Sequence, residues 1–284
     1  MRSEAGPVEG TIQSPDGVPI WTRRWQPARP PRGHVVLVHG LKDHSARYAT
    51  LAAALNEAGL SVYGFDLRGH GRSGGPRAHV ARFDEYLADL GRFVRQVRTE
   101  QPTGPLFLFG HSMGGAIAVG FVLAGGERFD GLILSGAAVA PPPTIGAGAR
   151  AVTRLLSVLA PTARVFDLPD GAFSRDATTV EELRVDPLVF HGKATARLAA
   201  ELLRRMARSR PELARLELPV LVLHGSADRL TNPAGSQLLF DQSRSRDKRI
   251  KIYPGWFHDL LHEPGRQEVV NDIVQWLAIR LPDA

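Results

Sequence analysis

The amino-acid sequence predicts an α/β fold, in which a mainly parallel β-sheet is covered by helices on both faces. Short apolar runs alternate with helical patterns, as expected for strands that are buried on both sides. The chain of 284 residues, 43% hydrophobic and 23% charged, can form a sizeable core, and this composition argues against disorder. The alternation fails between residues 134 and 220, so we expect one α/β domain with an inserted segment.

The elements follow in chain order. Residues 9–25 are expected to form a β-hairpin, because two alternating runs flank the turn pair Asp16-Gly17. Together with this hairpin, six further strands make an eight-stranded, mainly parallel sheet; they are expected at residues 34–38, 61–65, 106–109, 132–134, 220–223 and 249–253. Helical patterns cover residues 48–57 and 86–98, and the apolar stretch 113–126 is too short to cross a bilayer, so we expect a buried helix there.

The inserted segment follows the sixth strand and contains no strand pattern. It begins with Pro141-Pro142-Pro143 and carries two helical repeats, Val152, Leu155, Leu156 and Leu159, then Leu198, Leu202, Leu203 and Met206. Between them, Thr178 with Glu181, or Thr179 with Glu182, offers a helix capping box. The first repeat either packs on the core or faces lipid, and the sequence leaves both interpretations open.

Composition excludes several classes of function. Zero cysteines exclude disulfides, thiolate zinc sites, iron–sulfur clusters and a cysteine nucleophile. The net charge of +6 comes from arginines spread along the chain without a DNA- or RNA-binding motif, so we expect no nucleic-acid partner. The first thirty residues lack an apolar h-region; we therefore expect no signal peptide and a cytoplasmic location, with peripheral membrane contact at most.

Two segments match the pattern G-x-S-x-G, which marks a serine on a sharp turn between a strand and a helix. The segment around Ser73 has neither a strand before it nor a helix after it. Gly110-His111-Ser112-Met113-Gly114 follows a strand directly and enters the buried helix, whose N-terminal dipole favours an anion. We therefore expect Ser112 to be the catalytic nucleophile and Ser73 to be a loop residue.

A serine nucleophile needs a base and a carboxylate that orients the base. Asp228 and His258 each follow a strand, in the chain order Ser, Asp, His, at the sheet edge where Ser112 emerges. Without that order, Asp228 would be an Asx turn and His258 a surface histidine. The oxyanion donors are expected to be the backbone amides of Met113, after the nucleophile, and Leu41, in the loop after the strand at residues 34–38.

His258-Asp259-Leu260-Leu261-His262 imitates a zinc motif, with histidines at i and i+4. An aspartate replaces the glutamate base of that motif, and no helix is signalled upstream. We therefore expect no metal and no cofactor.

Longer motifs resemble the α/β-hydrolases, and more narrowly the monoacylglycerol lipases and their lysophospholipase-like relatives. The family's loop H-G-x-G-E-H-x-x-R-Y is matched by residues 39–48, and D-x-R-G-H-G-x-S by residues 66–73. G-H-S-M-G-G is matched by residues 110–115 and D-P-L-V-x-H-G-K by residues 186–193, so the resemblance covers nearly the whole chain. Departures are Lys42 in place of a glycine, Asp43 in place of a glutamate and one extra residue between His258 and His262.

The resemblance implies an α/β-hydrolase core at residues 1–136 and 216–284, with a helical cap at residues 137–215 that lines an acyl tunnel and touches a membrane or micelle. It also implies that Asp43, Arg47 and His262 contact a glycerol head group. The implied activity is hydrolysis of lipid carboxylic esters, above all of monoacylglycerol to fatty acid and glycerol, through an acyl-Ser112 intermediate. The alternatives are a lysophospholipase, a general carboxylesterase, a carbon–carbon bond hydrolase and a non-catalytic ligand receptor.

Overall fold

The computed structural model describes residues 6–142 and 145–282, so Pro143 and the ends of the expected core segments, residues 1–5 and 283–284, lie outside the described residues. Within the described chain, eight strands form one sheet in the order β1-β2-β4-β3-β5-β6-β9-β10. The strands are β1 (Val8–Gln13), β2 (Pro19–Trp25), β3 (Gly33–Val38), β4 (Leu60–Phe65), β5 (Leu106–His111), β6 (Gly131–Ser135), β9 (Val220–Gly225) and β10 (Lys248–Tyr253). The hairpin strands β1 and β2 pair antiparallel, β2 pairs antiparallel with β4, and the remaining neighbours are parallel.

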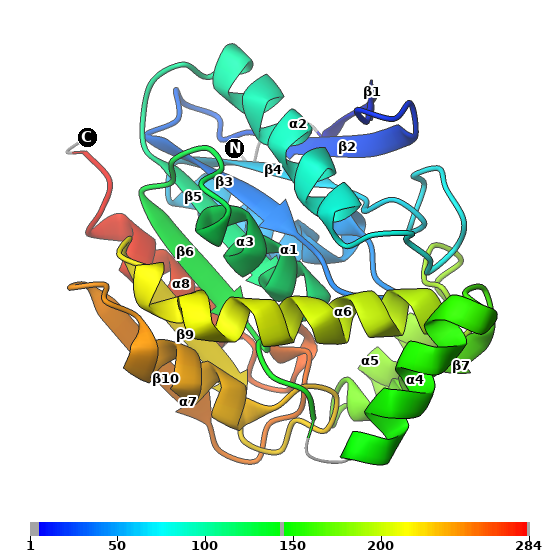
Figure 1. Ribbon diagram of the computed structural model, residues 1–284. Coiled ribbons are helices and arrows are strands. Elements are labelled where there is room, and N and C mark those ends of the chain that lie inside the picture. Colours follow the sequence, from blue (N-terminus) through cyan, green and yellow to red (C-terminus); the bar gives the residue numbers. More distant parts are fainter. Residues whose placement is uncertain (1–5, 143–144, 283–284) are drawn as a thin grey trace.

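Helices cover both faces of the sheet (Figure 1). Helices α1 (Ala49–Glu57) and α8 (Gln267–Ala278) contribute to the apolar core on one face, and α2 (Asp84–Glu100), α3 (Met113–Leu123) and α7 (Pro233–Gln242) to the core on the other. Strand β5 supplies both cores, because successive side chains of a strand point to opposite faces. Its Phe107 and Phe109 join the α1 and α8 side, and Leu106 and Leu108 join the α2 and α3 side.

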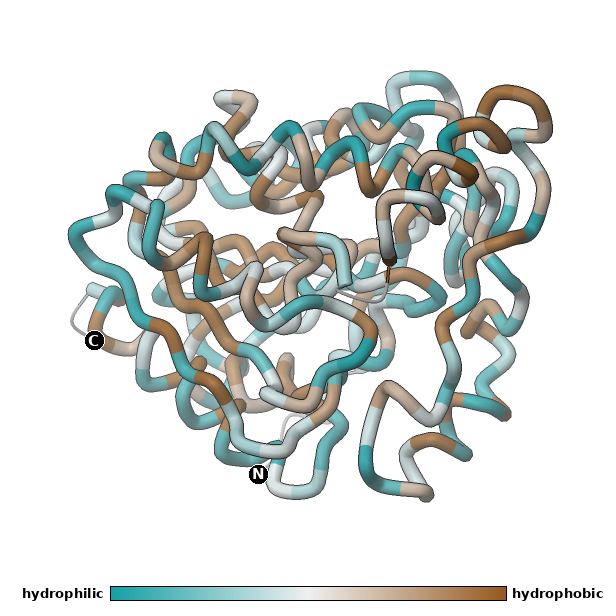
Figure 2. Tube along the Cα trace, turned by 60° about the horizontal axis from the view of Figure 1, so that its bottom comes forward, coloured by the Kyte–Doolittle hydropathy of each residue, from teal (hydrophilic) through white to brown (hydrophobic). Residues whose placement is uncertain are grey.

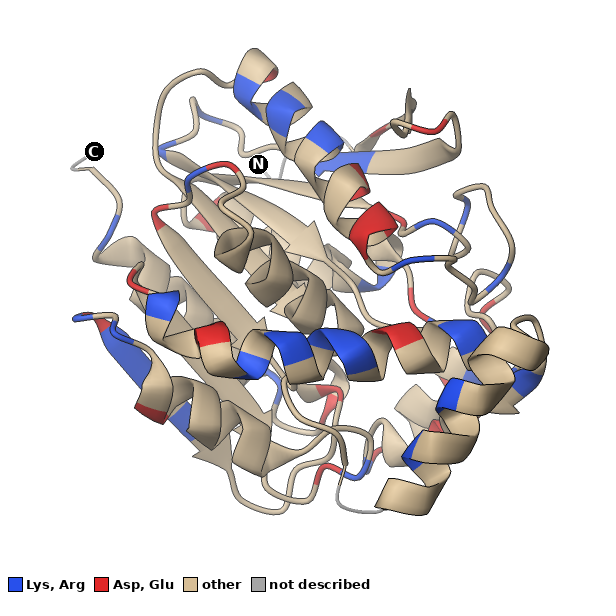
Figure 3. Cartoon of the chain, in the orientation of Figure 1, with Lys and Arg blue, Asp and Glu red and all other residues tan. Residues whose placement is uncertain are grey.

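The central strands match the expectation of burial on both faces. Every residue of β3, β4, β5, β6 and β9 is buried. Figure 2 shows hydrophobic residues along the interior strands, and Figure 3 shows that Lys and Arg lie on the outer elements, such as α2 and α6 (Ala196–Ser209), rather than on the central strands. The predicted α/β class, with a mainly parallel eight-stranded sheet, is therefore confirmed, and the strand ends differ from the predicted ones by two residues or fewer.

The segment between β6 and β9, which we call the cap, contains α4 (Ala147–Leu159), α5 (Ala177–Val185) and α6. The expectation that it holds no strand is wrong, because β7 (Arg164–Phe166) and β8 (Ala194–Thr195) pair antiparallel in a second, two-stranded sheet. Strands of three and two residues are too short to produce a recognisable alternation of polar and apolar positions. Short 3₁₀ helices complete the fold: η1 (Ser45–Tyr48), η2 (Asp170–Ala172), η3 (Arg210–Arg215) and η4 (Leu260–His262).

The predicted capping box of α5 is also wrong. The N-cap residue is Asp176, whose carboxylate accepts a hydrogen bond of 3.0 Å from the backbone N–H of Thr178. Aspartate caps a helix as well as serine or threonine does, so the helix begins before either threonine could cap it. Thr178 and Thr179 therefore lie inside the helix.

The position of α3 depends on a close approach to β3. A Cβ atom at Gly114 would lie 2.2 Å from the carbonyl oxygen of Val38 and 2.4 Å from that of His39, both of which belong to the backbone. Because backbone atoms cannot turn aside as a flexible side chain can, any larger residue would push α3 away from the sheet.

We expect Gly114→Ala to lower the free energy of unfolding by about 3 kcal/mol, since overpacking against rigid backbone costs ~1–3 kcal/mol or more. Gly148→Ala is the matched control, because a Cβ there meets nothing within 4 Å and alanine favours a helix over glycine. Chemical denaturation of both variants measures the difference. Equal unfolding free energies for the two variants would contradict the close-approach argument.

Candidate active site

Ser112 occupies a turn of a single residue between β5, which ends at His111, and α3, which begins at Met113. Its backbone has φ 54° and ψ −120°, a conformation that costs a residue other than glycine about 1–3 kcal/mol. The strand and helix on either side hold the turn in place, and the side chain stands at the N-terminus of α3. Within the described part of the chain, Ser112 Oγ has no hydrogen-bond partner and faces a cavity.

Two backbone N–H groups next to Ser112 are available as donors. An added Cβ at Gly40 would lie 3.0 Å from Ser112 Cβ, so the loop after β3 lies directly against the serine. Neither the N–H of Leu41 nor that of Met113 has a partner among the described residues, and both residues line the same cavity as Ser112. This arrangement is suited to holding an oxyanion, as the sequence predicts for these two amides.

Asp228 and His258 are in direct contact. Asp228 lies in the loop after β9 and His258 in the loop after β10, and the two residues are joined by a distance of 2.7 Å between His258 Nδ1 and Asp228 Oδ2. The other carboxylate oxygen of Asp228 accepts the backbone N–H groups of Leu230 at 2.7 Å and Thr231 at 3.0 Å. The imidazole is therefore fixed with Nδ1 donating and Nε2 free.

His258 lies beside the serine turn without a hydrogen bond to Ser112 in the described structure. The ring of His111, the residue before Ser112, lies with its centroid 4.8 Å from that of His258. The structure thus brings Ser112, Asp228 and His258 to one edge of the sheet, and it joins the last two directly. Catalytic hydrogen bonds to the nucleophile are often long without substrate and tighten when the substrate binds.

The charges around His258 favour its protonated form. Burial alone would lower the pKa of His258, but the Asp228 carboxylate, and more distantly Asp259 and Asp43, raise it above the ordinary imidazole value. Burial would raise the pKa of Asp228, but the His258 charge and hydrogen bonds from two histidines hold it well below its usual range. Burial and the nearby His258 lower the pKa of His111 to about 4, so His111 is neutral near pH 7.

The cavity at Ser112 holds about 600 Å³ of empty space, part of it open to solvent, and its walls are mostly apolar. The core contributes Leu41, Met113 and Leu230 next to the serine, and the cap contributes Phe166, Leu168, Leu202, Leu203 and Met206. A mostly apolar pocket that is also lined by a serine hydroxyl is suited to a hydrophobic ligand with a reactive polar group.

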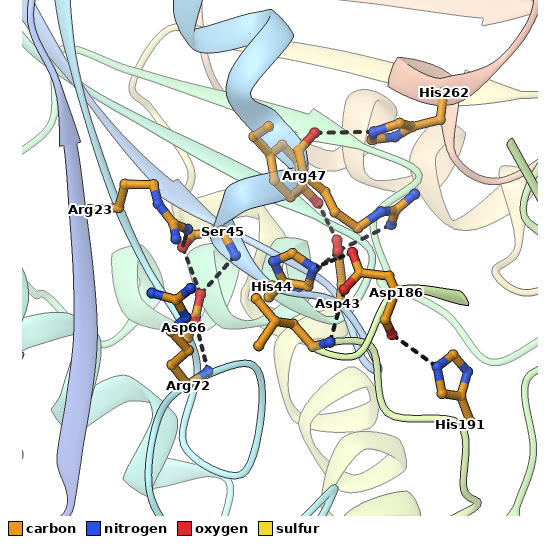
Figure 4. A network of polar contacts seen from close by, with 12 residues as sticks. Arg23, Asp43, His44, Ser45, Arg47, Asp66, Arg72, Asp186, His191 and His262 are labelled. Carbon is orange, nitrogen blue, oxygen red and sulfur yellow. Dashed lines mark hydrogen bonds and ion pairs between the residues drawn. The ribbon is translucent and has the colours of Figure 1, made fainter. Parts of the chain in front are cut away.

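Asp43, Arg47 and His262, the expected head-group residues, form one network that Figure 4 shows in part; Asp43 is buried, and Arg47 and His262 are partly buried. Arg47 donates to Asp43 at 3.1 Å and to Asp259 at 2.9 Å. His262 Nδ1 lies 2.9 Å from Asp259, and its Nε2 lies 3.1 Å from the carbonyl oxygen of Arg47. None of the three lines the cavity at Ser112 as described, and most of their polar atoms bind one another.

Lys42, one of the departures from the family motif, connects the loop of Leu41 to the cap. Its backbone has φ 70°, a region that favours glycine. Its ammonium group donates to the carbonyl oxygen of Leu168 and to Asp170, both at 3.0 Å, and its carbonyl oxygen accepts the N–H of Phe190 at 3.0 Å. The adjacent His44 also contacts Asp186 of the cap at 2.9 Å (Figure 4).

Two alternative interpretations of the sequence find no support in the geometry. The first is the zinc motif of His258 and His262. Both ring nitrogens of His262, and Nδ1 of His258, already have protein partners. Residues Leu260–His262 form a 3₁₀ turn, so the two histidines do not form an α-helical zinc motif. The hydroxyl of Ser73 is buried, donates to the carbonyl oxygen of Asp66 and accepts the N–H of Trp21 at 2.8 Å. The Ser73 hydroxyl therefore stabilises its loop through these two hydrogen bonds, and the geometry does not favour it as a nucleophile.

Sequence reasoning missed three residues of the site. His224 and Thr231 both contact Asp228, at 3.0 Å and 2.7 Å, and Asp259 joins Arg47 to His262. A usable signal exists only for His224, because a histidine at the end of an apolar strand, four residues before Asp228, has to find a buried partner.

Comparisons with known proteins identify the family of the chain. A family model described as serine aminopeptidase, S33 matches residues 29–265. The monoacylglycerol lipase of Mycolicibacterium smegmatis is 40% identical over 270 residues, 93% of this chain and 95% of that protein. The monoglyceride lipase of Homo sapiens is 33% identical over 275 residues, 95% of this chain and 90% of that protein. A solved structure, a soluble variant of monoglyceride lipase from Saccharomyces cerevisiae in complex with a substrate analog, superposes with a TM-score of 0.88 at 25% identity, covering 99% of this chain and 97% of that one.

We expect a fluorophosphonate probe to label Ser112 alone. Ser112→Ala should abolish labelling and lower kcat by roughly 10⁴-fold or more, since the oxyanion donors alone retain a small residual rate. Ser73→Ala is the control and should still be labelled, although the loss of two buried hydrogen bonds will lower its Tm. Mass spectrometry of the labelled peptide identifies the residue, and a label on Ser73 would overturn the assignment.

Proposed function

Because the chain belongs to the serine aminopeptidase S33 family, we propose that it is a serine hydrolase that cleaves monoacylglycerol to a fatty acid and glycerol. The chain has the α/β-hydrolase fold that its motifs predict, and its relatives include monoacylglycerol lipases. The observation that carries the proposal is the mostly apolar cavity lined by Ser112 together with Leu41 and Met113, whose backbone N–H groups have no partner among the described residues.

The geometry of the site supports the following reaction. Ser112 Oγ attacks the ester carbonyl while His258 Nε2 accepts its proton, and the N–H groups of Leu41 and Met113 hold the oxyanion. Asp228 keeps His258 in the required tautomer and stabilises the imidazolium that forms. His258 then passes the proton to the departing glycerol oxygen, and a water molecule hydrolyses the acyl-Ser112 by the same steps in reverse.

The acyl chain occupies the cavity. We propose that the network of Asp43, Arg47 and His262, which does not itself line this cavity, meets the glycerol, as the family motif implies. Arg47 carries five N–H donors, of which Asp43 and Asp259 accept two, so this residue keeps donors for a hydroxyl group. Asp43 and His262 hold Arg47 in place. Hydrogen bonds between this network and the glycerol require glycerol hydroxyls that are not esterified.

The outer face of α4 contacts the lipid surface. Three of the four residues of the apolar repeat, Val152, Leu155 and Leu159, are between 56% and 72% exposed, and the fourth, Leu156, is partly buried. Val158 beside them is 72% exposed, so most of this face does not pack on the core. The inner side of the same helix contributes Thr153 to the cavity wall. None of the described helices is long and apolar enough to span a membrane, so the contact we propose is peripheral.

We expect a preference for monoacylglycerol over triacylglycerol of the same chain length. A second acyl chain would have to displace cap helices, and esterified hydroxyls would leave the head-group network unpaired, at ~1–3 kcal/mol for each lost contact. Two lost contacts separate the substrates by roughly a hundredfold in kcat/KM. The measurement compares monoolein with triolein in the same detergent, and similar values would make the protein a general esterase.

Replacing Leu155 and Leu159 with serine should reduce hydrolysis of micellar long-chain substrate by roughly tenfold or more, because each buried apolar side chain contributes ~1.5–3 kcal/mol to lipid contact. Hydrolysis of a soluble short ester should not change. Ile279→Ser, which alters another exposed apolar residue far along the chain in the turn after α8, is the control. An equal loss on both substrates, together with a lowered Tm, would contradict the lipid-contact assignment.

A further inference from the structure

His224 is a buried histidine that the proposed reaction does not use. It lies near the end of β9, four residues before Asp228, and is completely buried. Its Nε2 lies 3.0 Å from Asp228 Oδ2, and its Nδ1 lies 2.7 Å from the hydroxyl oxygen of Ser236 on α7. Both ring nitrogens thus have a partner, and one partner is the carboxylate that holds His258.

The partners determine which ring nitrogen of His224 carries the proton when the ring holds only one. The ionised carboxylate of Asp228 only accepts hydrogen bonds, so His224 Nε2 must be the protonated nitrogen. Nδ1 is then an acceptor, and Ser236 must donate its hydroxyl proton to it. Ser236 is itself completely buried and therefore holds the ring in this tautomer.

His224 and His258 donate to the same oxygen. Asp228 Oδ2 lies 2.7 Å from His258 Nδ1, 3.0 Å from His224 Nε2 and 2.7 Å from Thr231 Oγ1. A donor that stabilises the negative charge of a carboxylate leaves less of that charge to stabilise a neighbouring cation. The hydrogen bond from His224 to Asp228 therefore weakens the attraction between Asp228 and protonated His258.

We propose that His224, fixed by Ser236, is a positioning residue that makes His258 a base at a lower pH by sharing the carboxylate of Asp228. This inference rests on the proposed triad, but it does not depend on which ester is the natural substrate. Without this shared donor, His258 would hold its proton to a higher pH and would act as a base in a smaller fraction of molecules near neutrality.

Other charged and titratable groups also face His258, and they set the background against which His224 acts. They come from the loops after β9, β3 and β10 and from the end of β5: Asp228, Asp43, Asp259 and His111. Of these, Asp228 alone hydrogen-bonds His224 in the described structure. A substitution of His224 that leaves Asp228 in place therefore changes the hydrogen bond to Asp228 and leaves the other three groups as they are.

The test compares two amide variants of equal polarity. In His224→Gln, the amide nitrogen can occupy the place of Nε2 and donate to Asp228; in His224→Asn, the shorter side chain can reach Ser236 but not Asp228. We expect His224→Asn to move the acidic limb of kcat/KM for a soluble p-nitrophenyl ester upward by about one pH unit, and His224→Gln to restore the wild-type limb. A purely structural role would lower Tm in both variants without separating their pH profiles.

Ser236→Ala provides a second route if His224→Asn does not fold. It leaves His224 present but removes the donor to Nδ1, so we expect a smaller upward shift of the same limb. The pH dependence of fluorophosphonate labelling measures the same ionisation without turnover.

Asp228→Asn distinguishes a failure of this inference from a failure of the proposed function. If Asp228→Asn abolishes labelling while His224→Asn and Ser236→Ala keep the wild-type limb, the triad stands and the role of His224 is overturned. If Asp228→Asn is labelled at the wild-type rate, both the triad and the role of His224 are overturned.

Discussion

The close approach of α3 to the sheet is the constraint on which the site depends. A Cβ atom at Gly110 would lie 2.6 Å from the carbonyl oxygen of Gly114, and one at Gly114 would lie 2.2 Å from that of Val38. Because strand and helix come this close, only one residue fits in the turn between them, and that residue is forced to a positive φ. The strained conformation of Ser112 is therefore a result of packing in the core, and the serine is held rigidly beside the loop of Leu41.

Buried carboxylates then fix the loops around the serine. Asp66 accepts the backbone N–H groups of Ser45 and Arg72, both at 2.8 Å (Figure 4), and so joins the loops after β3 and β4. Asp228 does the same for the loops after β9 and β10 through His258. Each carboxylate has several donors, which is the condition for keeping a buried charge without a large loss of stability. Polar contacts thus hold together segments that are remote in sequence.

Most of the fold was predictable from local patterns, and part of the site was not. The lengths of apolar runs identified the strands, and the strand and helix on either side of Ser112 separated it from Ser73. The two cap strands were not predicted, because they are too short to show an alternation of polar and apolar residues. The contact between Arg47 and Asp259 joins residues 212 positions apart, so no local pattern predicts it.

Lys42 joins the cap to the loop that contains Leu41. The residue that follows Leu41 is anchored at Leu168, Asp170 and Phe190, and these bonds are one of several contacts between the hydrolase core and the cap, such as that of His44 with Asp186. Exchanging the cap for that of a relative with glycine at this position would leave a buried ammonium group without its acceptors. The two parts are consequently not interchangeable modules, and a transplanted cap would have to bring its own residue at position 42.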